Sequence, residues 1–199
     1  MMMNYRPTAK GFSLIEVLIA LFILAVGILG IIGLQLYAKQ NNFDAIQRAS
    51  AAALATDIVE RMRMNKTDLI NYIVTKEPVT APNAIPSSCN TPAAGCAPTD
   101  ITNRDLDTWY SMISGLAEKQ STTGDYTGGL TEPSACIIRD PLGKGGTVGQ
   151  SEYRIVIAWR GRTPLSNSTA TTCGNDSTGT RYGTDNVYRR VYVLDAKIE

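Results

Sequence analysis

Hydrophobic residues are concentrated in one stretch near the start of the chain. Residues 17–34 form a run of eighteen positions without a charged side chain. About 20 apolar residues, at a rise of 1.5 Å per residue, cross the roughly 30 Å hydrocarbon layer of a bilayer, so this run is long enough to span one. The charges among the first eleven residues are two cations, Arg6 and Lys10. Because positive flanks tend to stay in the cytoplasm, the pattern predicts a membrane anchor whose C-terminal side is exported.

Beyond residue 36 the chain turns polar without a helix-breaking residue, and apolar side chains recur at three- and four-residue spacing. This period is typical of an amphipathic helix. The pattern predicts one helix over residues 13–65, whose outer half packs an apolar stripe against C-terminal strands. The stripe consists of Phe43, Ile46, Ala49, Ala53, Leu54, Ile58 and Met62.

The middle of the chain is predicted to contain a loop and a short helix. Residues 75–104 hold five of the nine prolines together with Cys89 and Cys96, which excludes a long helix or a central strand there. Thr102 and Asp105 then offer helix-start chemistry. We expect a short helix from this point to about Lys119. Its buried face would carry Leu106, Trp109, Ile113 and Leu116, with Trp109 in the core.

Alternating apolar and polar side chains predict strands in the last third of the chain. Residues 135–139 and 152–160, separated by a turn-forming Asp-Pro-Leu-Gly sequence and further glycines, are predicted to form a hairpin. In the second strand, Tyr153, Ile155, Ile157 and Trp159 share one face and Arg154, Ala158 and Arg160 the other, as in a strand with one buried side.

Residues 187–198 are predicted to form the last strand. The Ser-, Thr-, Asn- and Gly-rich residues 161–186 before it carry Cys173. They are either disordered, stapled by a disulfide, or an exposed recognition surface. Together these elements predict an α+β fold: a long N-terminal helix, transmembrane in its first half, packed on an antiparallel sheet of three to five strands, with a short extra helix and two disulfides.

Composition removes several functional classes. The formal net charge of +1 gives no strongly basic face for phosphates, so nucleic-acid binding is not expected. Histidine is absent, and with it the commonest general base, the usual zinc ligand and every Ser-His or Cys-His nucleophile pair. The acids show no catalytic spacing. Asp176 and Asp185 lack the dense carboxylate pattern of a calcium loop. We therefore expect no enzyme, no cofactor and no metal.

Four cysteines, at positions 89, 96, 136 and 173, all lie in the polar part of the chain, and none forms a C-x-x-C pair. Two structural disulfides are the natural interpretation, and these persist in an oxidising compartment such as the periplasm. Four cysteines permit three pairings. Our preferred one joins Cys89 to Cys96 across a short loop, which leaves Cys136 with Cys173.

Glu16 decides between three interpretations of the apolar segment. A secretory signal peptide could end at Ala25-Val26-Gly27, but the apolar run continues past it. A plain anchor gives no reason for a carboxylate in lipid, which costs about 2.5 to 3.5 kcal/mol. Cleavage before Phe12 would create an α-amine one helical turn from Glu16. In a packed bundle the amine of a shifted neighbour could then neutralise Glu16, and this pairing would fix the axial register.

The residues Lys10-Gly11-Phe12-Ser13-Leu14-Ile15-Glu16-Val17 closely resemble the class III signal of type IV pilins and type II secretion pseudopilins. The resemblance implies that a membrane aspartic peptidase, prepilin peptidase, cuts between Gly11 and Phe12 and methylates the new amine at Phe12. It assigns Glu16 to assembly. The expected parts are then a cytoplasmic leader (1–11), the transmembrane half of the helix (12–36), its periplasmic half (37–66) and a periplasmic globular domain (67–199).

Within that family, residues 20–35 are most similar to minor pilins of the PilV type. Many major pilins carry a proline partway along this helix, whereas no proline breaks residues 12–77 here, and Gly27, Gly30 and Gly33 are the weak points of the helix. The resemblance implies a minor pilin that joins other minor pilins and the major pilin, and a tip adhesin, to prime filament growth. Adhesion and twitching motility would depend on it. Before assembly its partner is inner-membrane lipid; afterwards it lies in the extracellular pilus. A type II secretion pseudopilin is the nearest alternative, and an anchored periplasmic enzyme a more distant one.

Overall fold

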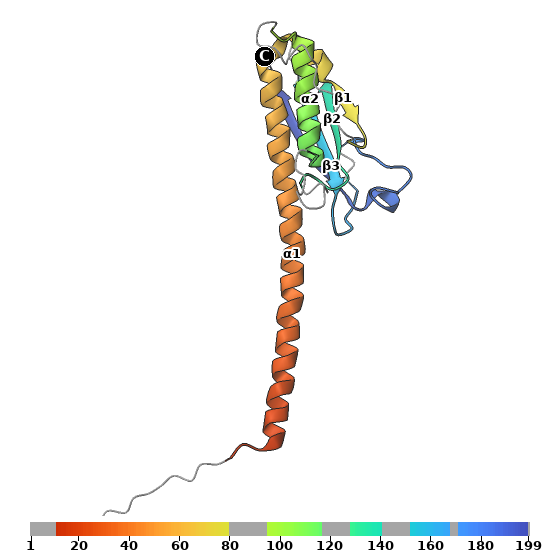
Figure 1. The fold of residues 1–199 in the computed structure, drawn as a ribbon. Coiled ribbons are helices and arrows are strands. Elements are labelled where there is room, and N and C mark those ends of the chain that lie inside the picture. Colours follow the sequence, from red (N-terminus) through yellow and green to blue (C-terminus); the bar gives the residue numbers. More distant parts are fainter. Residues whose placement is uncertain (1–10, 80–94, 117–127, 141–151, 168–170, 199) are drawn as a thin grey trace, which may run out of the picture. The chain divides into compact units, whose positions relative to one another are not determined.

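The longest element is α1 (Leu14–Met64), an uninterrupted helix of 51 residues. The computed structural model describes residues 11–79, 95–116, 128–140, 152–167 and 171–198 (Figure 1). It divides into two compact units, Met1–Phe43 and Asp44–Glu199, and α1 contributes to both. The helix begins and ends one residue inside the predicted limits. It runs through Gly27, Gly30 and Gly33 because single glycines cost about 1 kcal/mol each without breaking a helix.

The part of α1 inside the second unit packs through a stripe that the sequence placed slightly wrong. Among the expected members, Ile58 and Met62 are buried and Leu54 is partly buried, whereas Ile46, Ala49 and Ala53 are exposed. Six alanines within residues 45–55 fit several helical faces equally well, so spacing could not select one. The buried positions are Gln47, Ala51, Ala55, Ile58, Val59 and Met62.

Two shorter helical segments follow α1. A 3-10 segment, η1 (Lys66–Tyr72), was not predicted. The helix α2 (Pro98–Ser114) begins four residues before Thr102, so the expected start was wrong, and the loop predicted up to residue 104 ends at Pro98. Proline suits the first turn of a helix because its missing N–H would have no partner there. The helix also ends before the expected Lys119.

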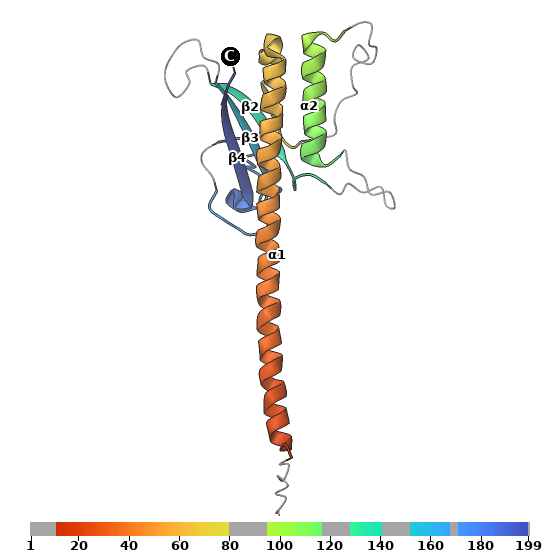
Figure 2. The same ribbon diagram turned by 90° about the vertical axis from the view of Figure 1, so that its left-hand side faces the viewer.

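Gly115 ends α2 because it adopts a left-handed conformation with φ of 72°. A Cβ on Gly115 would lie 1.9 Å from the carbonyl oxygen of Gly128, so both the backbone angle and the space require glycine. Trp109 is fully buried, as predicted, together with Ile113. Figure 2 shows α1 and α2 side by side over the sheet.

The sheet has four antiparallel strands in the order β1-β2-β3-β4, which confirms the predicted fold class. They are β1 (Val74–Lys76), β2 (Ser134–Asp140), β3 (Glu152–Arg160) and β4 (Arg189–Lys197). The predicted hairpin is confirmed, since β2 pairs with β3 from Asp140 opposite Glu152 to Ser134 opposite Ala158. The last strand begins two residues later than predicted.

The main core lies between the helices and the inner face of the sheet, where Tyr153, Ile155, Ile157 and Trp159 point. The expectation of a single buried side for β3 was wrong. Val156 and Ala158 on the opposite face are also fully buried. A smaller cluster covers that outer face, formed by Val156 with Cys136 and Cys173. The loop carrying Cys173 therefore folds back over the sheet.

Candidate assembly and processing site

The first unit has no buried side chain over residues 11–42 of the single chain. Its large apolar side chains up to Tyr37 keep between 46 % (Ile32) and 84 % (Phe12) of their surface exposed. Among the described residues, α1 is the one helix that is long and apolar enough to cross a membrane. So much continuous apolar surface in water is unfavourable, and it indicates a lipid or protein environment.

The Gly11–Phe12 bond lies before the helix. The carbonyl of Ser13 is the first acceptor of α1 and receives hydrogen bonds from the amides of Glu16 (3.0 Å) and Val17 (3.3 Å). Residues 11–13 are exposed and have no regular secondary structure. An exposed segment outside the helix can be bound in extended form by a peptidase.

Glu16 lies in the first turn of α1 and is exposed. A carboxylate there interacts favourably with the positive end of the helix dipole. The sequence predicted Phe12 on the same helical face as Glu16, but in the uncleaved chain Phe12 precedes the helix. The peptide nitrogen of Phe12 also has no charge for Glu16 to attract before cleavage. The expected pairing thus requires the cleaved amine.

Gly27, Gly30 and Gly33 are all helical, and a Cβ added at any of them would meet nothing within 4 Å. The single chain therefore offers no packing reason for these glycines.

Gln47 fixes the outer half of α1 to the rest of the second unit through its side-chain amide. Its Nε2 donates to the carbonyl of Gly129 (3.2 Å), and its Oε1 accepts from the amide of Thr131 (3.1 Å). The side chain thus pairs with the main chain of residues 129 and 131 as another backbone would, so its polar atoms are satisfied although it is buried. Gln47 could not be predicted from the sequence, because an amide on a core-facing position does not contribute to the apolar period.

A second polar contact joins the far end of α1 to α2 and η1. Arg61 donates to Asp57 (2.8 Å) and to Asp105 (3.2 Å), and the hydroxyl of Tyr72 donates to the other oxygen of Asp105 at 2.6 Å. Burial, followed by the hydrogen bond to Asp105, raises the pKa of Tyr72 above its ordinary value. The hydrogen bond to Asp57 is the largest of the effects that raise the pKa of Arg61.

The C-terminal loop is attached to the sheet by the Cys136–Cys173 disulfide, which links β2 to a residue 37 positions later. Of the three possibilities left open for residues 161–186, the described residues show the stapled loop. The Cys89–Cys96 pairing lies outside the described residues, because Cys89 does. Next to the disulfide, Glu77 accepts a hydrogen bond from the amide of Gly174 at 2.6 Å.

Arg189 is a buried cation that supports the same loop. Its side chain is 2 % exposed and donates to the carbonyls of Cys173 (2.6 Å) and Thr171 (2.7 Å). Burial lowers the pKa of its guanidinium. The role of Arg189 could not be predicted from the sequence, since an arginine at the start of a strand usually faces solvent.

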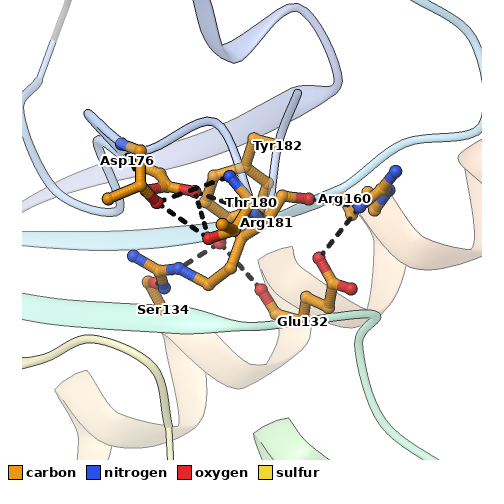
Figure 3. Close-up of polar contacts among 8 residues, drawn as sticks. Glu132, Ser134, Arg160, Asp176, Thr180, Arg181 and Tyr182 are labelled. Carbon is orange, nitrogen blue, oxygen red and sulfur yellow. Dashed lines mark hydrogen bonds and ion pairs between the residues drawn. The ribbon is translucent and has the colours of Figure 1, made fainter. Parts of the chain in front are cut away.

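Asp176 organises the turn at the tip of this loop (Figure 3). Its carboxylate accepts hydrogen bonds from the hydroxyls of Thr178 (2.6 Å) and Thr180 (3.2 Å) and from the amide of Arg181 (2.7 Å). These bonds hold the pKa of Asp176 well below its ordinary value, and the bond from the hydroxyl of Thr178 has the largest effect. The carboxylate is therefore occupied by its own loop.

In the described residues one group of possible metal ligands converges: Glu77, Cys136 and Cys173. Both sulfur atoms are joined to each other in the disulfide, so neither is a thiolate that could bind an ion. The second acid considered from the sequence, Asp185, is exposed and belongs to the short 3-10 segment η3 (Thr184–Asn186).

Two family models match the chain. Residues 6–32 match the prokaryotic N-terminal methylation motif, which spans Gly11, Phe12 and Glu16, and residues 33–107 match the model described as type IV pilin Tt1218. No curated protein and no solved structure matches it. The two matches are adjacent and meet within α1. Together with the apolar helix packed on a four-stranded antiparallel sheet, they make this chain a member of the type IV pilin family, a family of structural, non-enzymatic proteins, with the N-terminal motif that prepilin peptidase processes.

Proposed function

We propose that this pilin is a minor subunit of the type IV pilus, of the PilV type, which helps to start filament assembly and contributes to the tip complex. Adhesion and twitching motility depend on it through the filament. The resemblance of residues 20–35 to such proteins supports this assignment, as does the absence of proline from residues 12–77. Its partners are the other minor pilins, the major pilin and a tip adhesin.

One observation carries the assembly role: a fully exposed apolar half-helix contains a single carboxylate, Glu16, in its first turn. In lipid that carboxylate costs about 2.5 to 3.5 kcal/mol unless a cation meets it. Cleavage between Gly11 and Phe12 supplies a cation, the methylated amine of Phe12. When the amine of one subunit meets Glu16 of the next, both charges are satisfied at one axial stagger, and other staggers leave them unpaired.

The second unit supplies the surface by which partners distinguish this subunit. The hydrogen bonds of Gln47 to residues 129 and 131 and of Arg61 to Asp105 fix the outer half of α1 within this unit, so that half of the helix and the domain present one defined surface. Within the part of the chain that the structure describes, residues 161–167 and 171–183 of the stapled loop have no helix or strand. Loops held on a rigid support commonly carry recognition.

The proposed parts follow from processing. Residues 1–11 are the cytoplasmic leader, 12–36 the transmembrane half of the helix, 37–66 its periplasmic half and 67–199 the periplasmic domain. The subunit crosses the inner membrane once and leaves it for the extracellular pilus. A disulfide between Cys136 and Cys173 agrees with an oxidising compartment.

Mass spectrometry of the membrane-extracted protein tests the processing step. We expect a mature chain that begins at methylated Phe12, and a chain that keeps its leader would contradict the proposal. Deleting the gene then separates the pilus from the nearest alternative, the type II secretion pseudopilin. A minor pilin predicts fewer surface pili with normal enzyme secretion, whereas a pseudopilin predicts the reverse.

A further inference from the structure

Arginines gather at one end of the second unit, where β3 ends and β4 begins. Arg160 is the last residue of β3, Arg162 follows it, and Arg190 is the second residue of β4. Arg181 joins them from the stapled loop, because its carbonyl accepts a hydrogen bond from Arg160 at 2.5 Å. We name these four residues the basic rim. The buried Arg189 beside them faces the interior and is not part of it.

The basic rim lies at the end of the unit where α1 enters. Thr131 connects the two, since its carbonyl accepts from the amide of Arg160 (2.8 Å) and its amide donates to Gln47 of α1 (3.1 Å). The charge of Asp44, the first residue of the unit, also acts on Arg190. The basic rim and the first residues of α1 in this unit therefore lie at the same edge of the unit, which we call the entry edge.

Neutral oxygens hold most of the rim in place. Arg181 donates to the hydroxyl of Ser134 (2.8 Å), and Arg190 donates to the carbonyl of Thr163 and to its hydroxyl (3.2 Å). Three acids lie near the four arginines of the rim: Glu132 is 3.3 Å from Arg160 in an exposed pair, Asp176 accepts from the amide of Arg181 at 2.7 Å, and the charge of Asp44 acts on Arg190. Neutral acceptors orient a guanidinium without cancelling its charge, so the rim keeps an excess of positive charge.

An apolar side chain stands beside these charges. Leu165 is 57 % exposed, and its backbone is held by a hydrogen bond from its amide to the carbonyl of Val187 at 2.7 Å. Residues 162–166 are all exposed. Cations next to an exposed leucine on a fixed loop are typical of a surface that lies in the interfacial layer of a membrane.

Chain length keeps the start of the second unit close to the apolar segment. The apolar segment ends at Leu36, and the second unit begins at Asp44. Eight residues of helix measure about 12 Å at 1.5 Å per residue. The headgroup layer occupies roughly 5 to 7 Å of this distance. The remaining separation of about 5 to 7 Å is shorter than the Debye length of about 8 Å at physiological salt, so charges at the entry edge can act on headgroups.

We propose that the basic rim and Leu165 rest on anionic phospholipid headgroups while the subunit is anchored in the membrane before assembly. Anionic headgroups attract basic segments next to a membrane span. The contact gives the membrane-bound subunit a preferred orientation. When the subunit leaves the bilayer for a filament, the contact between the rim and the headgroups is broken. The proposal requires the anchor but not the minor-pilin role.

Hydrogen exchange of the full chain in nanodiscs, one copy per disc, tests this contact. We compare discs of phosphatidylcholine alone with discs containing phosphatidylglycerol. Amides of residues 161–167 are expected to exchange at least about threefold more slowly in the anionic discs, and 0.5 M salt is expected to abolish the difference, because screening shortens the Debye length to about 4 Å. Equal exchange in the two discs would overturn the proposal, as would a chain that does not enter the disc.

Matched double variants assign the effect to the rim. Arg162→Glu with Leu165→Ser changes one exposed cation and one exposed apolar side chain, and is expected to lose the slower exchange. Lys66→Glu with Ile70→Ser makes the same two changes at exposed positions on η1 and is expected to keep it. The exchange is also measured in discs that hold two copies of the chain. If exchange at residues 161–167 slows with the second copy and does not respond to lipid charge, the rim contacts another subunit, and the lipid contact is overturned. A filament-assembly defect with normal lipid-dependent exchange would affect only the proposed function.

Discussion

The indole nitrogen of Trp109 on α2 donates a hydrogen bond to the main-chain carbonyl of Leu54 on α1, at 2.8 Å. The two residues are 55 positions apart, and Trp109 is fully buried. This bond gives the packing of α2 against α1 a defined register, because it connects one side chain to one turn of the helix. The second tryptophan, Trp159, is also buried, but its indole nitrogen has no partner among the described residues.

These two tryptophans provide a matched pair for measuring the bond. Trp109→Phe and Trp159→Phe remove similar buried volume, but Trp109→Phe alone removes a hydrogen bond. We expect Trp109→Phe to reduce the free energy of unfolding by about 1 kcal/mol more than Trp159→Phe does. Urea unfolding of the full chain in detergent gives both values. An equal loss in the two variants would show that the bond to Leu54 contributes nothing net.

The Cys136–Cys173 disulfide is expected to be the largest single contribution to the stability of the loop. It closes a segment of 37 residues, for which loop-closure entropy gives about 4 kcal/mol. Replacing both cysteines by serine should lower the unfolding free energy by about this amount and expose the loop to proteases. Limited proteolysis with mass spectrometry would locate the cuts. An unchanged unfolding midpoint would contradict this account.

Two of the buried tyrosines, Tyr72 and Tyr110, make stability depend on pH in the alkaline range. Burial and Asp105 raise the pKa of Tyr72, and burial, followed by the charge of Asp107, raises the pKa of Tyr110 to about 12. The folded state therefore favours the neutral phenols. Their contribution is complete below the unfolded pKa of about 10 and is lost as the pH rises from there through the folded values.

We expect Tyr72→Phe to make unfolding less sensitive to pH between 8 and 11. At pH 8 the variant should also lose about 1.5 to 3 kcal/mol, since Asp105 loses a hydrogen bond to a charged acceptor. Urea midpoints at the two pH values give both effects. The exposed Tyr37 supplies the control, and Tyr37→Phe should behave as the parent does. An unchanged pH dependence in Tyr72→Phe would remove Tyr72 from this account.

The sequence determined the elements better than their contacts. The apolar run, the lack of proline in residues 12–77 and the alternation along residues 153–159 were enough to place α1 and the hairpin of β2 and β3. The stripe on α1 could not be placed, because its alanines satisfy several faces and because Gln47 is buried through hydrogen bonds. Periodicity detects apolar side chains, and it cannot detect a polar group whose partner lies 82 residues away.

For the candidate site, the processing motif could be predicted from the sequence, whereas the residues that support the C-terminal loop could not. Gly11, Phe12 and Glu16 lie within six residues, so their chemistry could be argued from spacing. Asp176 and Arg189 act on a loop whose path depends on a disulfide and on the sheet below it. No pattern around Arg189 signals that its guanidinium will be 2 % exposed. Such roles follow from three-dimensional proximity alone.

Asp176 is expected to control the order of the loop tip. Asp176→Asn removes a charge that accepts bonds from Thr178, Thr180 and Arg181, so amides of residues 177–182 should exchange about tenfold faster at pH 7. Because the folded pKa of Asp176 is lowered, its contribution is present above the unfolded value of about 3.9 and is lost as the pH falls through the folded one. Asp185→Asn is the control, since Asp185 is exposed with φ of 56°, a conformation that asparagine tolerates. Equal exchange in the two variants would contradict this role.

Glu16 provides the sharpest test of the assembly account. Glu16→Ala keeps the Gly11–Phe12 bond and the start of α1 at Leu14, so cleavage is expected to remain near normal. Incorporation into filaments should fall at least about tenfold, because the amine of the neighbouring Phe12 then enters the apolar core without an anion. Quantitative mass spectrometry of sheared pili, normalised to the membrane pool, measures this ratio.

A control on the same helix distinguishes the loss of a carboxylate in the apolar half of α1 from the loss of any carboxylate on α1. Glu60 lies in the outer half of α1, is exposed and pairs with Arg63 at the surface. Exposed pairs of this kind contribute about 0 to 1 kcal/mol, so Glu60→Ala should be incorporated normally. If Glu16→Ala entered filaments as well as Glu60→Ala did, the carboxylate would have no part in setting the stagger. The exposed apolar half of α1 would then have to align subunits by packing alone, and Glu16 would need another explanation.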